Sequence, residues 1–357
     1  MKKILVIALS GIGDALMFTP ALSILKKTLP SSEIDALIMF KGVKDIYERL
    51  PEINTIHYFD FLKNSKLDSL KFVMQLRKNE YDAVINVYPS NRKEYNLISL
   101  LIGAPKRAGI EYLRSNIKEL GFLNNIRVRE DDSVHNVEEN IKLVEKLTGA
   151  KETDISGLRV ILNSEEIEFA NQFVSKIKEN ENQLLIGFHP GCNTLKNHEK
   201  RRWEIEKFAE LGNKLIEKFD AKILLFGGPD EIDLKMGVIN KIKKDSAFSV
   251  DTNTFTQTAA IIEKVDLFIT NDSSLMHTAA AMKRDVIAII GPTNKNYIYP
   301  WKTNYEIASL ELECSPCFIY SPRPLTCSRT DIQFKCIKEL NVDTVYNKAL
   351  QMLQKTN

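Results

Sequence analysis

The sequence lacks a long apolar segment and has no excess of charge of either sign. No stretch approaches the ~18 consecutive apolar residues that span a bilayer, so we expect no transmembrane helix. Lys and Arg number 49 against 47 Asp and Glu, which gives no global electrostatic argument for binding nucleic acid. Short-period repeats and low-complexity segments are also missing. With 357 residues, 44% of them hydrophobic, the composition is typical of a soluble globular protein with two or three domains.

The first residues begin like a secretory signal, with two lysines before an apolar run. Ser10, Gly11 and Gly13 interrupt that run, Asp14 stops it, and no small-residue cleavage site follows. A strand that leads into a loop is the better interpretation, and we expect the protein to be cytoplasmic.

Apolar runs that suit buried strands alternate with helical patterns along the chain. Strands are expected at residues 4–9, 34–40, 55–59, 83–87, 184–188, 222–226, 266–270 and 286–290. Helices are expected at residues 15–29, 43–50, 67–79, 203–219, 256–264, 275–281 and 342–354, with a helix and polar turn at 163–182. This order indicates β-α-β units with parallel sheets. We predict an α/β protein with two domains, residues 1–165 and 166–357, and with packing of the terminal helix on the first domain as an option.

Residues 268 to 281 combine several groups that bind phosphorylated ligands. A buried strand is predicted to end at Asp272, and Ser273 and Ser274 suit the N-cap of the helix that follows. His277 would lie on its first turn. A helix start offers unpaired N–H groups and positive dipole charge to phosphate oxygens, while Asp272 can accept hydrogen bonds from sugar or ribose hydroxyls. We therefore expect this segment to hold a phosphorylated ligand.

A glycine-containing loop follows the first predicted strand. Gly11 and Gly13 match two glycines of the dinucleotide-binding fingerprint, but Leu16 stands at the third. The acidic residue of that fingerprint would also lie ~20 residues further on, not at Asp14. The glycines would let the backbone turn tightly and aim the Asp14 carboxylate into a cleft as a general base. Alternatively, Asp14 only caps the helix expected from residue 15.

Two further loops follow predicted strands in the second half. In the first, Gly191 permits close approach of a ligand to the backbone, and Arg201 could bind a diphosphate through two N–H groups at once. The alternative is a solvated basic loop, with His189 as a packed residue at the strand end. In the second, Glu231 follows two glycines and could accept ribose hydroxyls, or it could serve only the turn and the helix start.

Four of the five cysteines lie close together near the end of the sequence, at Cys314, Cys317, Cys327 and Cys336. One Cys-x-x-Cys pair invites a zinc interpretation, but the second pair has a different spacing. Disulfides are disfavoured in a reducing cytoplasm. A structural zinc site, a redox-labile pair and unliganded thiols remain open.

Together these motifs resemble glycosyltransferase family 9, the family of the ADP-heptose:lipopolysaccharide heptosyltransferases. Family blocks correspond in order to residues 11–22, 185–191, the basic segment ending at Trp203, 226–231, and 270–280 with 291–293. The resemblance implies a GT-B fold, in which two Rossmann-like domains face each other across a central cleft. It also implies inverting transfer of a sugar from a nucleotide donor, without a cofactor or an obligatory metal.

The resemblance assigns roles to individual residues. The first domain would bind the acceptor and the second the nucleotide sugar. Asp14 falls on the proposed base, Glu231 on the ribose contact, and Arg201 where the family usually has a phosphate-binding Lys. Ser274 occupies a position at which the family commonly has Gly. The expected donor-binding residues are Gly191, Cys192, Arg201, Glu231, Asp272, Ser273, Ser274 and His277, and the expected acceptor contacts are Gly13 and Arg107.

The resemblance favours ADP-heptose as the donor and a lipopolysaccharide core or related glycan as the acceptor. A lipid-linked acceptor would bring the protein to the inner face of the cytoplasmic membrane, where Lys41, Lys44, Lys106 and Arg107 are candidate contacts. The main alternative is a nucleotide-sugar epimerase of similar fold. A nicotinamide-dependent oxidoreductase is disfavoured by Leu16, and a catalytically silent nucleotide-binding protein has no need of Asp14.

Overall fold

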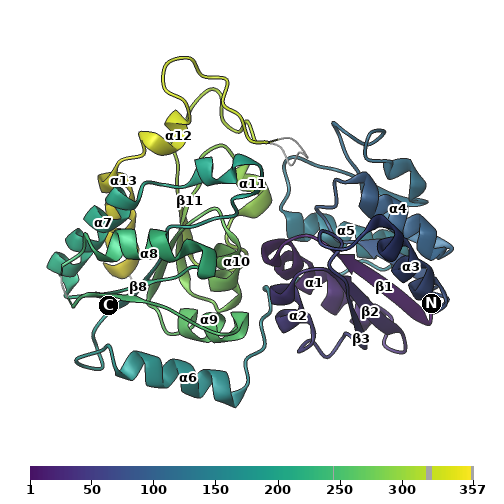
Figure 1. Ribbon diagram of the computed structural model, residues 1–357, viewed down its shortest axis with the longest axis horizontal. Coiled ribbons are helices and arrows are strands. Elements are labelled where there is room, and N and C mark those ends of the chain that lie inside the picture. The colour runs from purple at the N-terminus through teal and green to yellow at the C-terminus, as the bar shows by residue number, and fades with distance from the viewer. Residues whose placement is uncertain (244, 319–323, 355–357) are drawn as a thin grey trace. The chain divides into compact units, whose positions relative to one another are not determined.

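The computed structural model describes residues 1–243, 245–318 and 324–354 and contains, within them, two parallel six-stranded sheets (Figure 1). Each sheet belongs to its own compact unit, Met1–Ile161 or Leu162–Asn357. Helices flank both sheets, so the prediction of an α/β protein with two Rossmann-like domains is confirmed. The division between the units lies four residues before the predicted boundary at residue 165.

The first domain has the strand order β3-β2-β1-β4-β5-β6. Its strands are β1 (Lys3–Ala8), β2 (Glu33–Ile38), β3 (Thr55–Tyr58), β4 (Ala83–Asn86), β5 (Lys106–Glu111) and β6 (Ile126–Arg129). Its helices are α1 (Ile12–Thr28), α2 (Lys41–Tyr47), α3 (Lys66–Arg77), α4 (Lys93–Ile102), the 3₁₀ turn η1 (Gly121–Leu123) and α5 (Asn136–Thr148). Because the chain runs outward through β2 and β3 and then returns to β4, the strand order reverses between β1 and β4.

The second domain repeats this arrangement in the order β12-β11-β10-β7-β8-β9. Its strands are β7 (Leu185–His189), β8 (Lys222–Leu225), β9 (Ala247–Ser249), β10 (Leu267–Asn271), β11 (Asp285–Ile289) and β12 (Tyr305–Ala308). Its helices are α6 (Ser164–Ser175), η2 (Leu195–Arg201), α7 (Ile205–Phe219), η3 (Pro229–Glu231), α8 (Ile232–Ile239), α9 (Phe255–Ile262), α10 (Ser274–Ala281), α11 (Lys295–Ile298), α12 (Lys335–Lys338) and α13 (Val342–Gln354). Here the order reverses between β7 and β10.

Continuous apolar runs produce the central strands, because a strand covered by helices on both faces buries every side chain. All five residues of β7 and all five of β10 are buried. The terminal helix α13 packs against α7 within the second domain, where Val345 and Ala349 join the core. That it also packs on the first domain stays a prediction.

The expected strands and helices correspond to elements of the structure, with ends shifted by a few residues. The largest shifts are three residues: α1 begins at Ile12 and not at residue 15, and α2 ends at Tyr47 and not at residue 50. The sequence analysis did not predict β5, β6, α4 and α5 in the first domain or β9, β12, α11 and α12 in the second, and it expected α8 only as a helix start after Glu231. No helix within the described residues is both long and apolar enough to cross a membrane.

Candidate functional site

The predicted donor residues gather at the carboxyl ends of β7 and β10, the neighbouring strands at which the order of the second sheet reverses. His189 is the last residue of β7, and Asp272 directly follows β10. Thr270 of β10 is paired in register with His189. Ligands of open α/β sheets bind at this position, because the connections leave the sheet in opposite directions and open a crevice.

Arg201 and Asp272 form a buried ion pair at this edge. Nη1 of Arg201 donates to Oδ2 of Asp272, and the hydroxyl of Thr293 donates to the same oxygen over 2.7 Å. The Arg201 guanidinium also lies over the ring of Phe318, 5.3 Å from its centroid. The structure therefore brings two predicted donor residues together, and each holds the other in place.

Glu231 lies in a second network of the same domain. Its Oε2 is 3.1 Å from Nε2 of His189 and accepts from the Gly228 N–H over 3.1 Å, while Arg202 Nη2 is 3.5 Å from its Oε1. Burial favours the protonated carboxyl, but the hydrogen bonds and the charge of Arg202 hold the pKa of Glu231 below its usual range. Glu231 is therefore an ionised acceptor at neutral pH.

Gly191 is explained by this carboxylate. A Cβ at Gly191 would lie 1.9 Å from Oε1 of Glu231, too close for any side chain. The sequence analysis expected the glycine to let a ligand approach the backbone. In the structure, the group that lies against the Gly191 backbone is the Glu231 carboxylate. A ligand at this position would therefore contact that carboxylate.

Ser273 occupies the N-cap position of α10, as predicted, but its side chain makes no capping hydrogen bond. Its Oγ lies 2.9 Å from Nδ1 of His189 and 3.1 Å from Oγ1 of Thr270. Ser274 is the first residue of the helix. Because Ser273 does not cap α10, the first N–H groups of that helix remain available to another acceptor.

Buried nitrogen atoms without a hydrogen-bond partner accumulate around these two networks. Within the described part of the chain they are Nε of Arg201, Nε of Arg202, Nε2 of His198 and Nδ1 of His277. Leaving a buried N–H unpaired costs about 1–3 kcal/mol, so native structures seldom keep several together without a purpose. An anionic ligand with several oxygen atoms would satisfy them.

Both histidines in this group are uncharged at neutral pH. Burial lowers the pKa of His277 to about 4, against the opposing charge of Asp272. Burial, with the nearby charge of Arg201, likewise lowers the pKa of His198 to about 4. His277 therefore cannot supply positive charge to a diphosphate, and the fixed positive charge comes from Arg201 and Arg202.

Cys192 supports the loop and is not a nucleophile. Its thiol donates to the carbonyl of His198 over 3.2 Å, and its own carbonyl accepts from Nη2 of Arg202 over 2.8 Å. Burial raises the pKa of the Cys192 thiol to about 11, so the reactive thiolate is scarce at neutral pH.

In the first domain, Asp14 lies beside the strand reversal, in the first turn of the helix that follows β1. It is the third residue of α1, whose N-cap is Gly11, so Asp14 does not cap the helix as the alternative required. Asp14 is partly exposed. The positive end of the helix dipole favours the ionised carboxylate, which is the form that accepts a proton.

Three hydroxyl groups fix the backbone around Asp14. Ser10 donates to the carbonyl of Pro89 over 2.6 Å, which ties the Asp14 loop to the loop after β4. Tyr95 donates to the carbonyl of Leu9, and Tyr47 donates to that of Ala15, each over 3.1 Å. These bonds hold the turn on both sides of Asp14.

The two predicted acceptor contacts lie at opposite edges of the first sheet. Gly13 is in the first turn of α1, next to Asp14. Arg107 is the second residue of β5, at the amino end of that strand, and its guanidinium donates to the carbonyls of Leu123 and Ala104. Arg107 therefore lies at the other end of the sheet from Asp14, and its contact with the acceptor stays a prediction.

The structure also shows polar residues that the sequence analysis missed. In the second domain, His189 links Ser273 with Glu231, and Thr293 supports Asp272. In the first domain, Glu130 follows β6 and accepts from the hydroxyl of Tyr88 over 2.8 Å; burial raises the pKa of Glu130. The His-Pro-Gly sequence after a strand was a usable signal for His189, whereas Glu130 had none.

The four C-terminal cysteines are free. The described residues contain no group of three or more His, Cys, Asp or Glu side chains that could hold a metal ion. The Cys327 sulfur accepts from the Phe334 N–H over 3.3 Å, and burial raises the pKa of Cys336 to about 11. The alternatives left open by the sequence stay open, and the charges of Cys314, Cys317 and Cys327 also act on Cys336.

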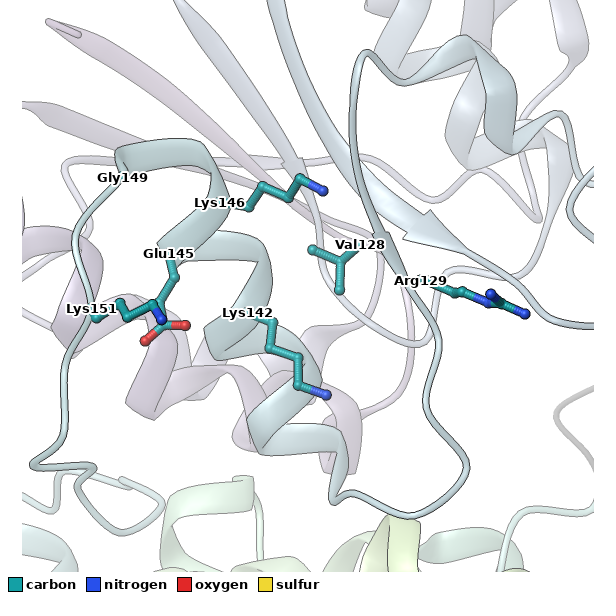
Figure 2. Close-up of a pocket in the computed structure, with 7 residues that line it drawn as sticks. All are labelled: Val128, Arg129, Lys142, Glu145, Lys146, Gly149 and Lys151. Atoms are coloured by element: carbon teal, nitrogen blue, oxygen red, sulfur yellow. The ribbon is translucent and has the colours of Figure 1, made fainter.

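A shallow pocket elsewhere in the first domain holds none of the predicted site residues. Figure 2 shows Lys142 and Lys146 projecting from α5 and Arg129 from the end of β6. Glu145, Gly149, Lys151 and Val128 complete the lining. It is a basic surface hollow that is separate from the strand reversal.

Comparisons with known proteins agree with this geometry. The model of glycosyltransferase family 9 (heptosyltransferase) matches residues 69–324, which include all predicted donor residues but not Asp14. A lipooligosaccharide heptosyltransferase 2 of Haemophilus ducreyi is 27% identical over 311 residues, covering 84% of this chain and 86% of the relative. A lipopolysaccharide heptosyltransferase 3 of Escherichia coli is 25% identical over 315 residues, covering 82% and 83%.

Solved structures share the fold. The family 9 glycosyltransferase of Veillonella parvula superposes with a TM-score of 0.77 at 23% identity, covering 99% of this chain and 97% of that one. The ADP-heptose lipopolysaccharide heptosyltransferase II of Escherichia coli gives a TM-score of 0.75 at 21% identity and covers both chains completely. Because the family model matches more than half of this chain, the chain belongs to glycosyltransferase family 9, the heptosyltransferase family.

Proposed function

We propose that this protein transfers a heptose from ADP-heptose to the core of lipopolysaccharide or a related glycan, with inversion at the anomeric carbon. Family membership supports glycosyl transfer, and the curated relatives are named for heptose transfer to lipopolysaccharide or lipooligosaccharide. An Escherichia coli heptosyltransferase of the same fold has been solved with ADP. In this proposal the first domain binds the acceptor and the second the donor.

The observation that carries the proposal is the cluster at the β7 and β10 ends. Two guanidinium groups and several buried nitrogen atoms without partners accompany the carboxylates of Asp272 and Glu231 there. A nucleoside diphosphate has the matching chemistry: diphosphate oxygens for Arg201, Arg202 and the start of α10, and ribose hydroxyls for Glu231.

The reaction is proposed as a single displacement. Asp14 takes the proton from an acceptor hydroxyl, whose oxygen forms a bond to the anomeric carbon as the bond to the diphosphate breaks on the opposite face. One displacement inverts the configuration. Negative charge grows on the departing diphosphate, where Arg201, Arg202 and the neutral His277 would stabilise it. Because two guanidinium groups supply this charge, we propose that no metal ion is required.

The epimerase alternative has a structural counterpart. A putative UDP-N-acetylglucosamine 2-epimerase of Listeria monocytogenes shares the fold with a TM-score of 0.51 at 14% identity. Two Rossmann-like domains alone therefore do not separate transfer from epimerisation. The family match favours transfer.

The test is a product analysis with the full chain. ADP-heptose, with and without a delipidated lipopolysaccharide core acceptor, should release ADP only when the acceptor is present, and equally well in EDTA. The anomeric configuration of the new linkage, read by NMR, should be opposite to that of the donor. A changed sugar nucleotide in the absence of acceptor would instead establish the epimerase, and retained configuration would exclude the single displacement.

A further inference from the structure

One exposed stripe of α3 carries three apolar side chains, where a surface helix normally presents polar ones. Val73 and Leu76 point into the core of the first domain and are buried. On the other side, Leu67, Leu70 and Met74 are 61%, 44% and 42% exposed. They are spaced by three and four residues, so they form one continuous stripe along the helix.

The neighbouring helix α4 also exposes apolar side chains. α3 and α4 pack against each other (Figure 1), and both bury side chains in the same core cluster. Leu97 and Leu100 of α4 are 37% and 38% exposed, and Leu62, just before α3, is 60% exposed. We call these six residues the leucine face: Leu62, Leu67, Leu70, Met74, Leu97 and Leu100.

Lysines are placed among these apolar side chains. Lys71 follows Leu67 by four residues and Lys78 follows Met74 by four, so both lie along the exposed stripe. Lys66 and Lys93 are exposed at the first residues of α3 and α4. These four lysines form no ion pair with the residues that the structure describes. The first turns of α3 and α4 also carry the exposed acidic residues Asp68 and Glu94, so basic residues outnumber acidic ones beside the leucine face.

This combination identifies the class of partner. Protein interfaces are depleted in Lys and enriched in aromatic residues, Met and Arg, whereas the leucine face has four lysines beside it and no aromatic residue among its six. An anionic bilayer surface takes up Leu and Met side chains at the acyl boundary and attracts lysines, whose long stems let the ammonium groups reach the headgroups. We propose that the leucine face docks the protein on the surface of an anionic lipid bilayer.

This docking surface is separate from the proposed transfer reaction and differs from the contacts expected from sequence. Lys41 and Lys44 lie on α2, and Lys106 and Arg107 lie at the amino end of β5. The leucine face combines charge with apolar area, which those four residues do not. The experiment that tests the docking surface measures membrane binding and not turnover. A negative result would therefore leave the proposed function unaffected.

The experiment is co-sedimentation of the full chain with vesicles of phosphatidylcholine alone or with phosphatidylglycerol added. Wild-type protein should bind the anionic vesicles and detach as salt is raised. Leu67→Ser, Leu70→Ser and Met74→Ser combined should weaken binding by at least about tenfold. Lys71→Glu with Lys78→Glu should weaken it by more than about fivefold per position.

Two matched controls separate this surface from nonspecific effects. Ile167→Ser, Ile232→Ser and Met236→Ser combined remove similarly exposed apolar side chains from the second domain and should leave binding unchanged. Lys41→Glu with Lys44→Glu removes the same charge from α2 and should also bind as the wild type. Failure of the wild type to bind anionic vesicles at low salt, or undiminished binding of the leucine-face variants, would overturn the proposal. So would a dimer in light scattering that those variants dissociate, since the face would then be a contact between copies.

Discussion

Arg201 and Asp272 stand 71 residues apart in the chain and form a buried ion pair at the carboxyl edge of the second sheet. Neither partner is independent of the other. A ligand that draws the Arg201 guanidinium toward its phosphates must compete with the Asp272 carboxylate, and the hydroxyl of Thr293 remains to support the carboxylate when this happens.

Removing one partner of this pair should cost both stability and affinity. We expect Arg201→Ala to lower the free energy of unfolding by about 3 kcal/mol, because it leaves the Asp272 charge buried without its counter-ion. ADP affinity, measured by calorimetry, should fall by at least about tenfold. The double variant Arg201→Ala with Asp272→Asn should recover much of the stability but none of the affinity. Recovery of ADP binding in that double variant would remove Arg201 from the site.

The glycines near Glu231 offer a matched pair of substitutions. Gly191→Ala places a methyl group 1.9 Å from the present position of Glu231 Oε1, so the carboxylate must move away from His189 and Gly228. A Cβ at Gly228 would meet nothing within 4 Å. We expect about a tenfold loss of ADP affinity for Gly191→Ala and none for Gly228→Ala. Equal affinities would show that the position of Glu231 does not matter to the nucleotide.

His189 should hold Glu231 and Ser273 in place through one tautomer. An ionised Glu231 can only accept, so Nε2 of His189 must carry a proton, and in the neutral ring Nδ1 then accepts from Ser273. Nitrogen chemical shifts of the labelled ring should report this tautomer. His189→Phe should weaken ADP binding by about tenfold while leaving the KM of the acceptor unchanged.

A second histidine serves as control for that prediction. His57 in the first domain makes comparable bonds, 3.0 Å to Tyr81 and 3.4 Å to Asp35. His57→Phe should leave ADP affinity unchanged. The opposite tautomer of His189, or equal effects of the two substitutions, would contradict a positioning role.

Asp14 should act on turnover and not on donor binding. Asp14→Asn keeps the size of the side chain but cannot take a proton, so kcat should fall by about 10²-fold to 10⁴-fold. ADP affinity should remain near that of the wild type, because the donor residues lie in the other domain. Full turnover by the Asn variant in a heptose-transfer assay would show that another group is the base.

Stability should fall as the pH drops from about 6.5 to about 4. The pKa of His277 is about 4 in the folded protein and 6.5 when unperturbed, so between these values the unfolded state binds a proton that the folded state does not. Its stabilising effect is complete above the unfolded pKa and is lost with falling pH, by up to about 3 kcal/mol. Urea midpoints at pH 7.5 and 5 should differ for the wild type and less for His277→Gln. The lowered pKa of His198 should likewise reduce the stability of the folded protein as the pH falls.

The sequence predicted the parts of the fold that hydrophobicity alone determines. Central strands such as β10 are uninterrupted apolar runs, and their order in the chain is sufficient for parallel sheets. β5, with the sequence Lys-Arg-Ala-Gly-Ile-Glu, has no such pattern and becomes a strand because its neighbours complete the ladder. α5 could have been found, since Val137, Ile141 and Val144 recur at helical spacing before Gly149.

The sequence identified candidate residues of the site but not their connections. Asp272 and Glu231 follow strands, and Arg201 lies in the basic segment before α7, in ways that sequence can recognise. That Asp272 pairs with Arg201 and that His189 joins Glu231 to Ser273 follows from strand adjacency, which local sequence does not contain. The neutrality of His277 likewise depends on burial by segments far away in the chain.

The unpaired nitrogens around Arg201 and Arg202 respond to the charge and oxygen spacing of an anion, and these are the same in every nucleoside diphosphate sugar. Such a cluster binds the diphosphate that these molecules share and does not distinguish their bases or sugars. Inorganic pyrophosphate should accordingly compete with any donor. Preference for one base or one sugar must arise from other contacts, so relatives with the same arginines can differ in the substrate they choose.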